Sequence, residues 1–192
     1  MTDLNAPYRL AVIVGSTREG RFGHNIAAWF AGQASQRDDV DVDVVDLDDH
    51  DIHSRFGPAG RAALAGFNER LDAADAFVVV TPEYNHSYPA ALKQAIDFAK
   101  TEWQAKPVGF VSYGGVSGGL RAVEHLRGVF AELHAMTLRD TVSLHNYPQL
   151  FDADGTLVDP EPVNVAAKKL LDSLAWWALA LRKARYEHPY TA

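Results

Sequence analysis

One pattern recurs along most of the chain: a short apolar run, then a polar turn, then a segment whose apolar residues have helical spacing. Continuous apolar runs, which fit strands buried on both faces, occupy residues 10–14, 76–80 and 107–111. Helical spacing follows these runs over residues 23–35, 88–100 and 120–133. Strands that alternate with helices form a parallel sheet covered on both faces, so the pattern restricts the chain to the α/β class.

Weaker segments continue the same pattern. Residues 40–45 alternate between apolar and acidic side chains, which predicts a strand with one face in water at an edge of the sheet. Residues 138–144 are expected to form a further strand, and helices are expected over residues 61–73 and 163–185. The chain of 192 residues contains no internal repeat, low-complexity segment or linker, which predicts a single domain over residues 1–192.

Composition argues against several classes of protein. The net charge of −7 argues against binding to nucleic acid or to an anionic membrane surface. The chain has no cysteine, which removes disulfides, thiolate metal sites and a cysteine nucleophile, and which fits a cytoplasmic protein. The first residues lack the features of a signal peptide, and no apolar run approaches the roughly 20 residues that span a bilayer. We therefore expect a cytoplasmic protein with no membrane segment.

The first loop, residues 15–25, follows the first apolar run and leads into a helix. Backbone amides at a helix start, together with hydroxyls and arginines, suit an anion. The spacing approaches the nucleotide-binding pattern G-x-x-x-x-G-K-[ST], but Arg21 replaces its lysine and Phe22 replaces the hydroxyl that binds Mg²⁺. The dinucleotide pattern G-x-G-x-x-G is absent as well. The loop is interpreted as a metal-free site for a phosphomonoester, and the alternative is a polar connection with surface arginines.

The second loop, residues 81–88, follows the second apolar run, and Pro82 is expected to end that strand. Ligands of open α/β sheets bind outside the carboxyl ends of the strands, where this loop lies. The ring of Tyr84 and the amide of Asn85 suit a flat aromatic ligand. The next helix is expected to have Pro89 in its first turn. An ordinary turn is the alternative, since proline, asparagine and serine are common turn residues.

The third loop, residues 112–119, contains four glycines directly after the strand expected over residues 107–111. Glycine lets the backbone approach a ligand closely and present its amides. A flexible turn is the alternative interpretation. Because the carboxyl ends of parallel strands lie at one edge of a sheet, the three loops are expected to converge there on one ligand.

Motifs in these loops resemble the NADPH-dependent FMN reductase family of flavodoxin-like proteins. They are Gly-Ser-x-Arg at residues 15–18, Pro-Glu-Tyr-Asn at residues 82–85 with the helix that follows, and Ser-Tyr-Gly-Gly at residues 112–115. The similarity covers roughly residues 8–185 and is greatest to the branch of FMN-dependent quinone, chromate and azo-dye reductases. It implies a flavodoxin-like three-layer sandwich, with a five-stranded parallel sheet in the order 2-1-3-4-5 between helices.

The resemblance also implies which residues bind FMN. Residues that would hold the phosphate are Ser16, Arg18, Arg21 and Asn25. Residues that would contact the isoalloxazine and the ribityl chain are Pro82, Glu83, Tyr84 and Asn85. Residues that would close over the other edge of the ring are Ser112, Tyr113, Gly114 and Gly115. Many members of the family have a small hydroxyl residue at the position of Arg21, where a guanidinium is at least as good a phosphate ligand.

The implied function is an FMN-dependent NAD(P)H oxidoreductase with no catalytic acid or base among its side chains. Hydride would pass from NADPH or NADH to FMN and then to a small-molecule acceptor such as free flavin, a quinone, an azo compound or chromate, in ping-pong order. A flavodoxin-type electron carrier that does not itself oxidise NAD(P)H is the alternative. The resemblance further implies a homodimer or homotetramer. Aromatic residues with area for such contacts, each more typical of a core, are Trp29, Phe30, Trp103, Trp176 and Trp177.

Two other patterns compete with this interpretation. Residues 115–119 match the G-x-S-x-G motif of serine hydrolases, but Tyr113 and Gly114 lie between the expected strand end and the motif, and no Asp–His pair stands out downstream. Residues 48–53 contain acids and histidines that suit a metal, and a charged surface loop explains them equally well. His86 is expected to be a turn residue that faces solvent. We therefore expect neither a metal site nor a catalytic serine.

Overall fold

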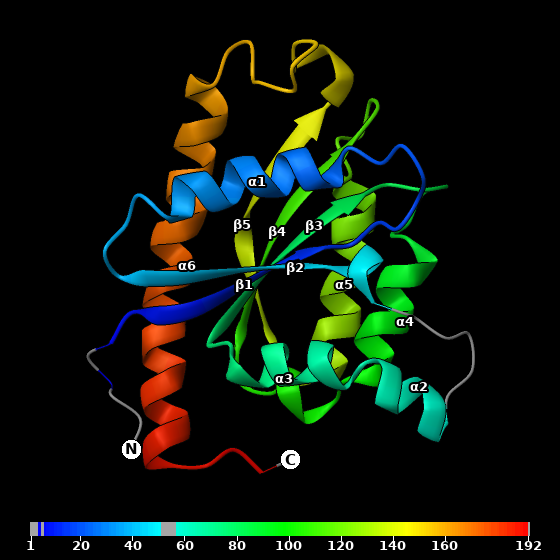
Figure 1. Ribbon diagram of the computed structural model, residues 1–192. Helices are drawn as coiled ribbons and strands as arrows, with labels where there is room; N and C mark the ends of the chain where they lie inside the picture. Colours follow the sequence, from blue (N-terminus) through cyan, green and yellow to red (C-terminus); the bar gives the residue numbers. More distant parts are fainter. Residues whose placement is uncertain (1–3, 5, 51–56, 192) are drawn as a thin grey trace.

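The computed structural model describes residue 4, residues 6–50 and residues 57–191. Five parallel strands form one sheet in the order β2-β1-β3-β4-β5, with β2 and β5 at its edges (Figure 1). The strands are β1 (Tyr8–Val14), β2 (Val40–Asp46), β3 (Ala76–Pro82), β4 (Pro107–Gly114) and β5 (Met136–His145). The predicted α/β class and the predicted strand order are confirmed.

Helices cover both faces of this sheet and complete three layers (Figure 1). On one face lie α1 (Gly23–Ala34) and α6 (Glu161–Glu187). On the other face lie α3 (Ala65–Ala73), α4 (Ala90–Phe98) and α5 (Leu120–Glu132). Shorter helices are α2 (Pro58–Ala63), η1 (Leu47–Asp49), η2 (Thr101–Trp103) and η3 (Tyr147–Gln149). Among the described residues, no helix has the length and apolar character needed to cross a membrane.

Side chains of the central strands alternate between the two cores. On β1, Leu10 and Val12 pack with Phe30 on the side of α1 and α6, whereas Ala11 and Ile13 pack on the opposite side. All five residues are at most 1% exposed. Burial on both faces explains why the central strands are continuous apolar runs. The edge strand β2 instead has several exposed positions, as its alternating sequence predicts.

Two helices differ from the prediction. The segment predicted as one helix over residues 61–73 forms two, because the chain turns at the buried Leu64, where φ is −102° and ψ is 10°. The helix predicted from Tyr88 begins at Ala90, because Pro89 has an extended backbone with ψ of 143° and a residue before proline avoids the helical region. Most of the other predicted helix ends differ from the observed ones by only one or two residues.

Both β3 and β4 extend further than the sequence predicts. Pro82 was expected to break β3, but it remains in the strand, opposite Tyr113 of β4. The backbone nitrogen of Pro82 faces β1. Because β1 pairs with β3 only as far as Val80, the missing N–H of Pro82 removes no hydrogen bond from the sheet. Likewise β4 continues to Gly114. The sheet therefore carries the second and third loops further outward than predicted.

The aromatic residues with possible contact area divide between core and surface. Phe30 and Trp103 are core residues with 0% and 1% exposure. Trp29 and Trp177 are partly buried. Trp176 is 64% exposed on α6, so it is a surface residue. The preference for core positions is confirmed for Phe30 and Trp103, is wrong for Trp176, and is met only in part by Trp29 and Trp177, which pack against the core from its edge.

Candidate functional site

Loops that follow β1, β3, β4 and β5 surround a cleft of about 430 Å³ at the carboxyl edge of the sheet. Its lining residues are Arg18, Glu19, Gly20, Arg21, Pro82, Glu83, Tyr84, Tyr113, Gly114, Gly115 and Tyr147. Small-molecule sites in proteins commonly have volumes of about 300–1,000 Å³. The three predicted loops therefore converge on one cleft, and the loop after β5 adds a wall that the sequence analysis missed.

The first loop presents unpaired donors. In the described part of the chain, the backbone amides of Thr17, Glu19 and Gly20 donate no hydrogen bond to another protein group. Arg18 takes part in no ion pair between described residues, and its guanidinium lies 5.8 Å from the centre of the Tyr84 ring. Free amides beside an unpaired guanidinium provide the donor set that a phosphate requires.

Arg21 differs from Arg18 because it has carboxylate partners. Its guanidinium donates to Asp46 at 2.8 Å and to Asp48 at 3.0 Å, and its side chain is 14% exposed. Burial opposes the charge, but the hydrogen bonds and the negative charges of Asp46 and Asp48 outweigh it and raise the pKa of Arg21. Arg21 therefore fastens the first loop to the end of β2, although it also lines the cleft.

Tyr84 begins a tight two-residue turn. Tyr84 and Ser87 exchange backbone hydrogen bonds of 2.8 and 3.1 Å, and the two residues between them, Asn85 and His86, have φ of 48° and 73°. Positive φ at both central residues is typical of a type I′ turn. The hydroxyls of Tyr84 and Ser16 share a hydrogen bond of 2.7 Å, which joins the second loop to the first. Tyr84 is thus fixed at the cleft, while Asn85 and the exposed His86 lie at the tip of the turn.

Glu83 joins the second loop to the third. Its carboxylate side chain is 5% exposed, accepts from the Ser117 hydroxyl at 2.7 Å, and forms an ion pair with the Arg121 guanidinium. The Arg121 backbone amide also donates to it at 3.3 Å. Burial opposes ionisation of Glu83, but the bond from Ser117 and the bonds and charge of Arg121 outweigh it, so its pKa lies below the usual value. This carboxylate therefore holds two walls of the cleft together.

The third loop depends on its glycines. Gly118 and Gly119 have φ of 59° and 83°, in the left-handed region that favours glycine. A Cβ on Gly118 would lie 2.5 Å from the Ser143 hydroxyl oxygen, and one on Gly119 would lie 2.7 Å from the Ser112 Cβ. The Ser112 and Ser143 hydroxyls each donate to the Gly118 carbonyl at 2.8 Å. A Cβ on Gly115, in contrast, would meet nothing within 4 Å, so this part of the cleft wall is open.

Two tyrosines form an aromatic wall. Tyr113 and Tyr147 have ring centres 5.1 Å apart at an interplanar angle of 80°. Tyr113 is 3% exposed, and its hydroxyl packs against Gly23 at the start of α1, where a Cβ would lie 2.8 Å from the oxygen. Burial raises the pKa of the Tyr113 hydroxyl, and the nearby Tyr84 and Tyr147 raise it further. Tyr113 therefore stays protonated at neutral pH.

Four of the predicted residues are not part of the cleft lining: Ser16, Asn25, Asn85 and Ser112. The Ser16 hydroxyl shares a hydrogen bond with the Tyr84 hydroxyl, and the Ser112 hydroxyl donates to the Gly118 carbonyl. Both serines therefore hold the cleft loops in place without lining the cleft. Asn25 lies next to Gly155, where a Cβ would come within 2.7 Å of its Nδ2.

The sequence analysis missed functional candidates that need the folded structure. Tyr147 follows β5, so its place at the carboxyl end of a strand was an available signal. Ser117 and Arg121 gave none, because their role depends on contact with Glu83 in another loop.

Neither competing pattern gains support. The argument that Tyr113 and Gly114 separate the strand from the G-x-S-x-G motif is wrong, since β4 runs to Gly114. Ser117 nevertheless donates to the Glu83 carboxylate, and no hydrogen bond among the described residues joins it to a histidine. Residues 51–53 of the acid-rich segment 48–53 lie outside the described residues. Within the described ones, no three histidines or acidic side chains are placed to hold a metal ion.

A parallel sheet of this order, with a cleft lined by loops at its carboxyl edge, defines a flavodoxin-like ligand-binding protein. The family model of NADPH-dependent FMN reductases matches residues 8–149. The chain therefore belongs to the NADPH-dependent FMN reductase family, as its loop motifs predict. It is an oxidoreductase that uses FMN and NAD(P)H.

Curated relatives and solved structures agree with this family. A probable NADPH:quinone oxidoreductase of Oryza sativa subsp. japonica is 33% identical over 187 residues, which cover 91% of this chain and 94% of the relative. A 2-hydroxy-1,4-benzoquinone reductase of a Burkholderia species is 32% identical, with 88% of this chain and 95% of the relative covered. A solved flavoenzyme NAD(P)H:(acceptor) oxidoreductase of Paracoccus denitrificans has the same fold, with a TM-score of 0.72 and 22% identity over 89% of this chain and 97% of that one.

Proposed function

We propose that this protein reduces quinones with NAD(P)H in ping-pong order, and that both substrates use the one cleft at the carboxyl edge of the sheet. The observation that supports this most is the combination of unpaired phosphate donors in the first loop with an open wall at Gly115. Bound FMN supplies a ring that takes up hydride from a nicotinamide and delivers it to a second substrate. The side chains described below bind FMN, orient it and enclose the cleft.

The donor set of the first loop fits the phosphate of FMN. Arg18 supplies an unpaired cation, and the amides of Thr17, Glu19 and Gly20 supply hydrogen bonds. We assign Arg21 a supporting role, because Asp46 and Asp48 already use its guanidinium. Three unpaired amides and one unpaired guanidinium are donors that suit the oxygens of a phosphomonoester.

The middle of the cleft fits a flat ring. Pro82 to Tyr84 and Tyr113 to Gly115 lie side by side at the ends of β3 and β4 as two adjoining walls, and Tyr147 also lines the cleft. The contacts made by the Glu83 carboxylate keep the first two walls at a fixed separation. The absence of any atom near a Cβ at Gly115 leaves room for a ring to approach the backbone. Asn85 is assigned to the support of Tyr84, since it stands at the tip of the turn.

The acceptor class is proposed from the relatives and from the rim of the cleft. Two relatives are named for the reduction of quinones. At the rim, Val116 is 88% exposed and Leu120 is 44% exposed, which provides apolar surface for a planar, weakly polar acceptor. The nicotinamide and the quinone would occupy the same cleft in turn, which is the basis of the ping-pong order.

Purified protein tests the proposal directly. We expect a yellow protein with an FMN spectrum that bleaches when NADPH or NADH is added anaerobically and recovers when a benzoquinone is added. Steady-state rates should give parallel lines in double-reciprocal plots. A yellow protein that NAD(P)H does not bleach would instead be an electron carrier, and intersecting lines would reject the shared cleft.

A matched pair of variants tests the phosphate assignment. We expect Arg18→Ala to weaken FMN binding by roughly ten- to a hundredfold, the effect of one lost charge-assisted hydrogen bond. Arg139→Ala removes an exposed arginine near the start of β5, which does not line the cleft, and should leave the affinity unchanged. Equal FMN affinities of the two variants would remove Arg18 from the site.

We further propose that the whole chain acts as one domain and assembles as a homodimer or homotetramer. The exposed Trp176 and Val165 of α6, at 64% and 59%, provide apolar surface for such an assembly. Sedimentation equilibrium of the FMN-loaded protein measures its mass, and a monomer at micromolar concentration would contradict the proposal.

A further inference from the structure

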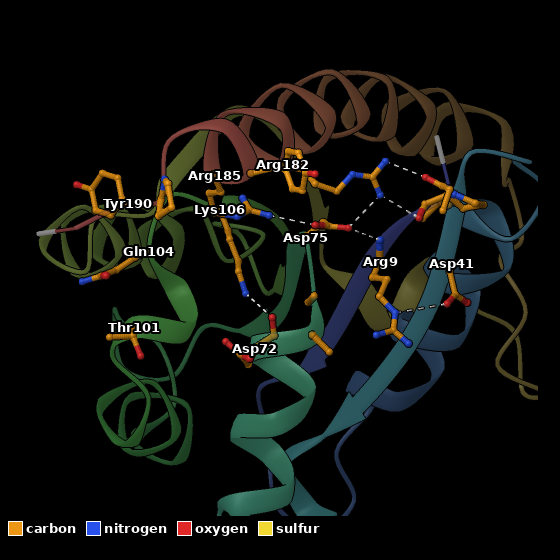
Figure 2. Close-up of a pocket in the computed structure, with 17 residues that line it drawn as sticks. Arg9, Asp41, Asp72, Asp75, Thr101, Gln104, Lys106, Arg182, Arg185 and Tyr190 are labelled. Carbon is orange, nitrogen blue, oxygen red and sulfur yellow. Dashed lines mark hydrogen bonds and ion pairs between the residues drawn. The ribbon is translucent and has the colours of Figure 1, made fainter. Parts of the chain in front are cut away.

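A second and larger cavity, of about 1150 Å³, lies at the opposite edge of the sheet, near the amino ends of the strands (Figure 2). The end of α3 borders it on one side and the last turns of α6 on another, and residues of β1, β2 and η2 complete the wall. It shares no lining residue with the cleft at the carboxyl edge. A ligand bound here would therefore not displace one bound there.

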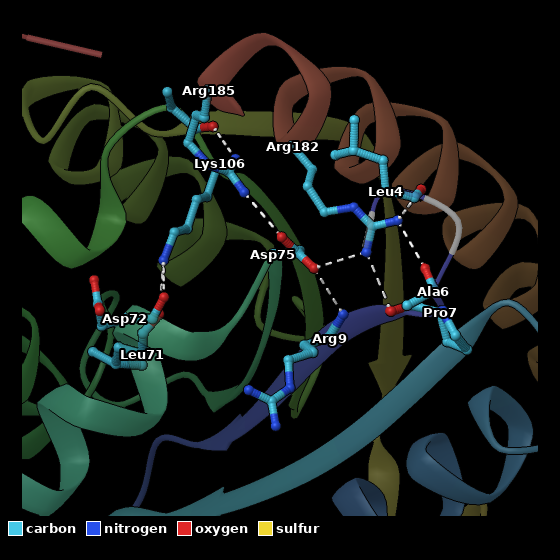
Figure 3. A network of polar contacts seen from close by, with 11 residues as sticks. Leu4, Ala6, Pro7, Arg9, Leu71, Asp72, Asp75, Lys106, Arg182 and Arg185 are labelled. Atoms are coloured by element: carbon cyan, nitrogen blue, oxygen red, sulfur yellow. Dashed lines mark hydrogen bonds and ion pairs between the residues drawn. The ribbon is translucent and has the colours of Figure 1, made fainter. Parts of the chain in front are cut away.

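Four cationic side chains line this cavity, and one largely buried carboxylate, that of Asp75, lies among them. Asp75 accepts from the Arg185 guanidinium at 3.0 Å, from the Arg182 guanidinium at 3.3 Å and from the Arg9 backbone amide at 3.1 Å (Figure 3). Its side chain is 13% exposed. Lys106, which is 6% exposed, adds a further cation to the same wall. In the described lining, Asp75 is thus the one largely buried acid beside three buried or partly buried cations.

Lys106 has no carboxylate partner. Its ammonium donates at 2.9 Å to the Leu71 and Asp72 carbonyls at the end of α3, and no ion pair between described residues includes it (Figure 3). An ammonium has three donors, so one remains available. Burial and, to a smaller extent, the neighbouring charge of Arg185 together lower the pKa of Lys106 to about 8, against the opposing charges of Asp72, Asp75 and Glu102. Among the described residues, the Lys106 charge therefore has no carboxylate in direct contact with it.

Arg9 and Arg185 also have donors to spare, unlike Arg182. Arg182 gives its terminal nitrogens to Asp75 and to backbone carbonyls of the N-terminal residues, so its role is structural. Within the described parts of the chain, the five N–H donors of the Arg185 guanidinium have two partners, the Ala105 carbonyl and Asp75. The Arg9 side chain is 61% exposed, and the one ion pair that it forms with a described residue, the exposed Asp41, is long at 3.9 Å.

The hydrogen-bond donors that remain free in this cavity indicate which chemical class of ligand it would bind. They come from Arg9, Lys106 and Arg185, and a phosphoryl group has three terminal oxygens with which to meet them, whereas a carboxylate has two. Four lining residues are cationic and three are acidic, in a chain whose net charge is −7. Two of these acids, Asp41 and Asp72, are exposed, so the interior is the more positive part. The half-exposed rings of Tyr186 and Tyr190, at 52% and 46%, line the same cavity.

We propose that the cavity at the amino ends of the strands binds a phosphate-bearing small molecule through Arg9, Lys106 and Arg185, independently of the cleft that holds FMN. The two tyrosine rings suit an attached aromatic group, as in a nucleotide. This second site would let a phosphorylated metabolite bind while the reductase cleft is occupied.

Isothermal titration of FMN-saturated protein at low ionic strength tests the proposal, with inorganic pyrophosphate and adenosine 5′-monophosphate as the two probes. We expect saturable binding of at least one probe at submillimolar concentration. Arg9→Gln should weaken it about tenfold, the loss of one charge-assisted contact. Because Arg9 is 61% exposed, this variant is expected to fold normally. Tighter binding of the nucleotide than of pyrophosphate would add the tyrosine rings to the site.

Three controls separate this site from others. Lys106→Met should reduce probe binding further, whereas Arg139→Gln, which removes an exposed cation elsewhere, should not change it. Arg18→Ala should weaken FMN but retain the probe, so failure of the FMN assignment and failure of this proposal are distinguishable. Absence of saturable binding to the wild type, or equal binding by wild type and Arg9→Gln, would overturn the proposal.

Discussion

Replacement of Glu83 by glutamine removes one negative charge and keeps the shape of the side chain. The carboxylate is 5% exposed and accepts from Ser117 at 2.7 Å and from the Arg121 amide at 3.3 Å, in addition to its ion pair with the Arg121 guanidinium. A hydrogen bond to a charged group contributes about 1.5–3 kcal/mol, and loss of one partner of a buried pair costs about 3–5 kcal/mol. Arg121 is 48% exposed, so it can turn to water and the cost falls toward the lower range. We expect Glu83→Gln to lower the free energy of unfolding by about 2 kcal/mol.

Urea unfolding of the apoprotein at neutral pH and at about pH 4 measures this effect. The folded-state pKa of Glu83 lies below its usual value of 4.5, so its contribution is present above that value and is lost as the pH falls through the lower folded pKa. The difference between wild type and variant should therefore shrink in acid. FMN affinity should fall as well, because the second and third loops would no longer be held together.

The control for Glu83→Gln is Asp97→Asn, which breaks the exposed pair between Lys93 and Asp97 at 2.6 Å. Exposed pairs one helical turn apart contribute only about 0.3–0.5 kcal/mol. If Glu83→Gln costs no more than this control at neutral pH, the carboxylate does not hold the loops, and the reasoning about the cleft walls is refuted.

Three further outcomes follow from contacts described above. Gly118→Ala should destabilise the protein by at least about 2 kcal/mol, because of its φ of 59° and the 2.5 Å approach to Ser143, whereas Gly115→Ala should leave urea unfolding unchanged and weaken FMN binding. Equal unfolding curves for the two variants would contradict the assignment of strain. Lys106 has a folded pKa of about 8, below its usual 10.5, so the folded state loses its proton first and stability should rise by about 2 kcal/mol between about pH 7.5 and about pH 9.5. Urea unfolding of Lys106→Met should lack this rise, and an identical rise would place the titration elsewhere. Tyr147→Leu should weaken FMN binding, measured by recovery of flavin fluorescence, with little change in the midpoint of unfolding.

The fold was predictable because its signals are local. Burial on both faces makes the central strands continuous apolar runs, and the acidic alternation of β2 marks an edge. The extension of β3 through Pro82 was not predictable, since it depends on where the neighbouring β1 stops pairing. A proline in a sequence predicts the end of a strand, unless the neighbouring strand on the side of its backbone nitrogen is known not to pair at that position.

The site was predictable only in part, because its decisive contacts join distant residues. Arg18 and Arg21 have the same predicted role in the loop motif, and only the fold shows that Asp46 and Asp48 are partners of Arg21. The motif predicts that Glu83 contacts the ligand. In the structure its carboxylate instead accepts a hydrogen bond from Ser117 and pairs with Arg121. The cavity around Asp75 is even less predictable from the sequence, because residues near the N-terminus, in α3 and in α6 form it together.

The helices that follow β1 and β3 leave the sheet toward opposite faces. After β1 the chain enters α1 on one face, and after β3 it enters α4 on the other, so the two connections diverge above the sheet (Figure 1). The cleft lies where they part, a position that the order of the strands creates and that no single side chain maintains. Loops can therefore change in length and composition without disturbing either core. Variation in the third loop is a route by which relatives with this same framework could acquire different electron acceptors, while the stability of the protein is conserved.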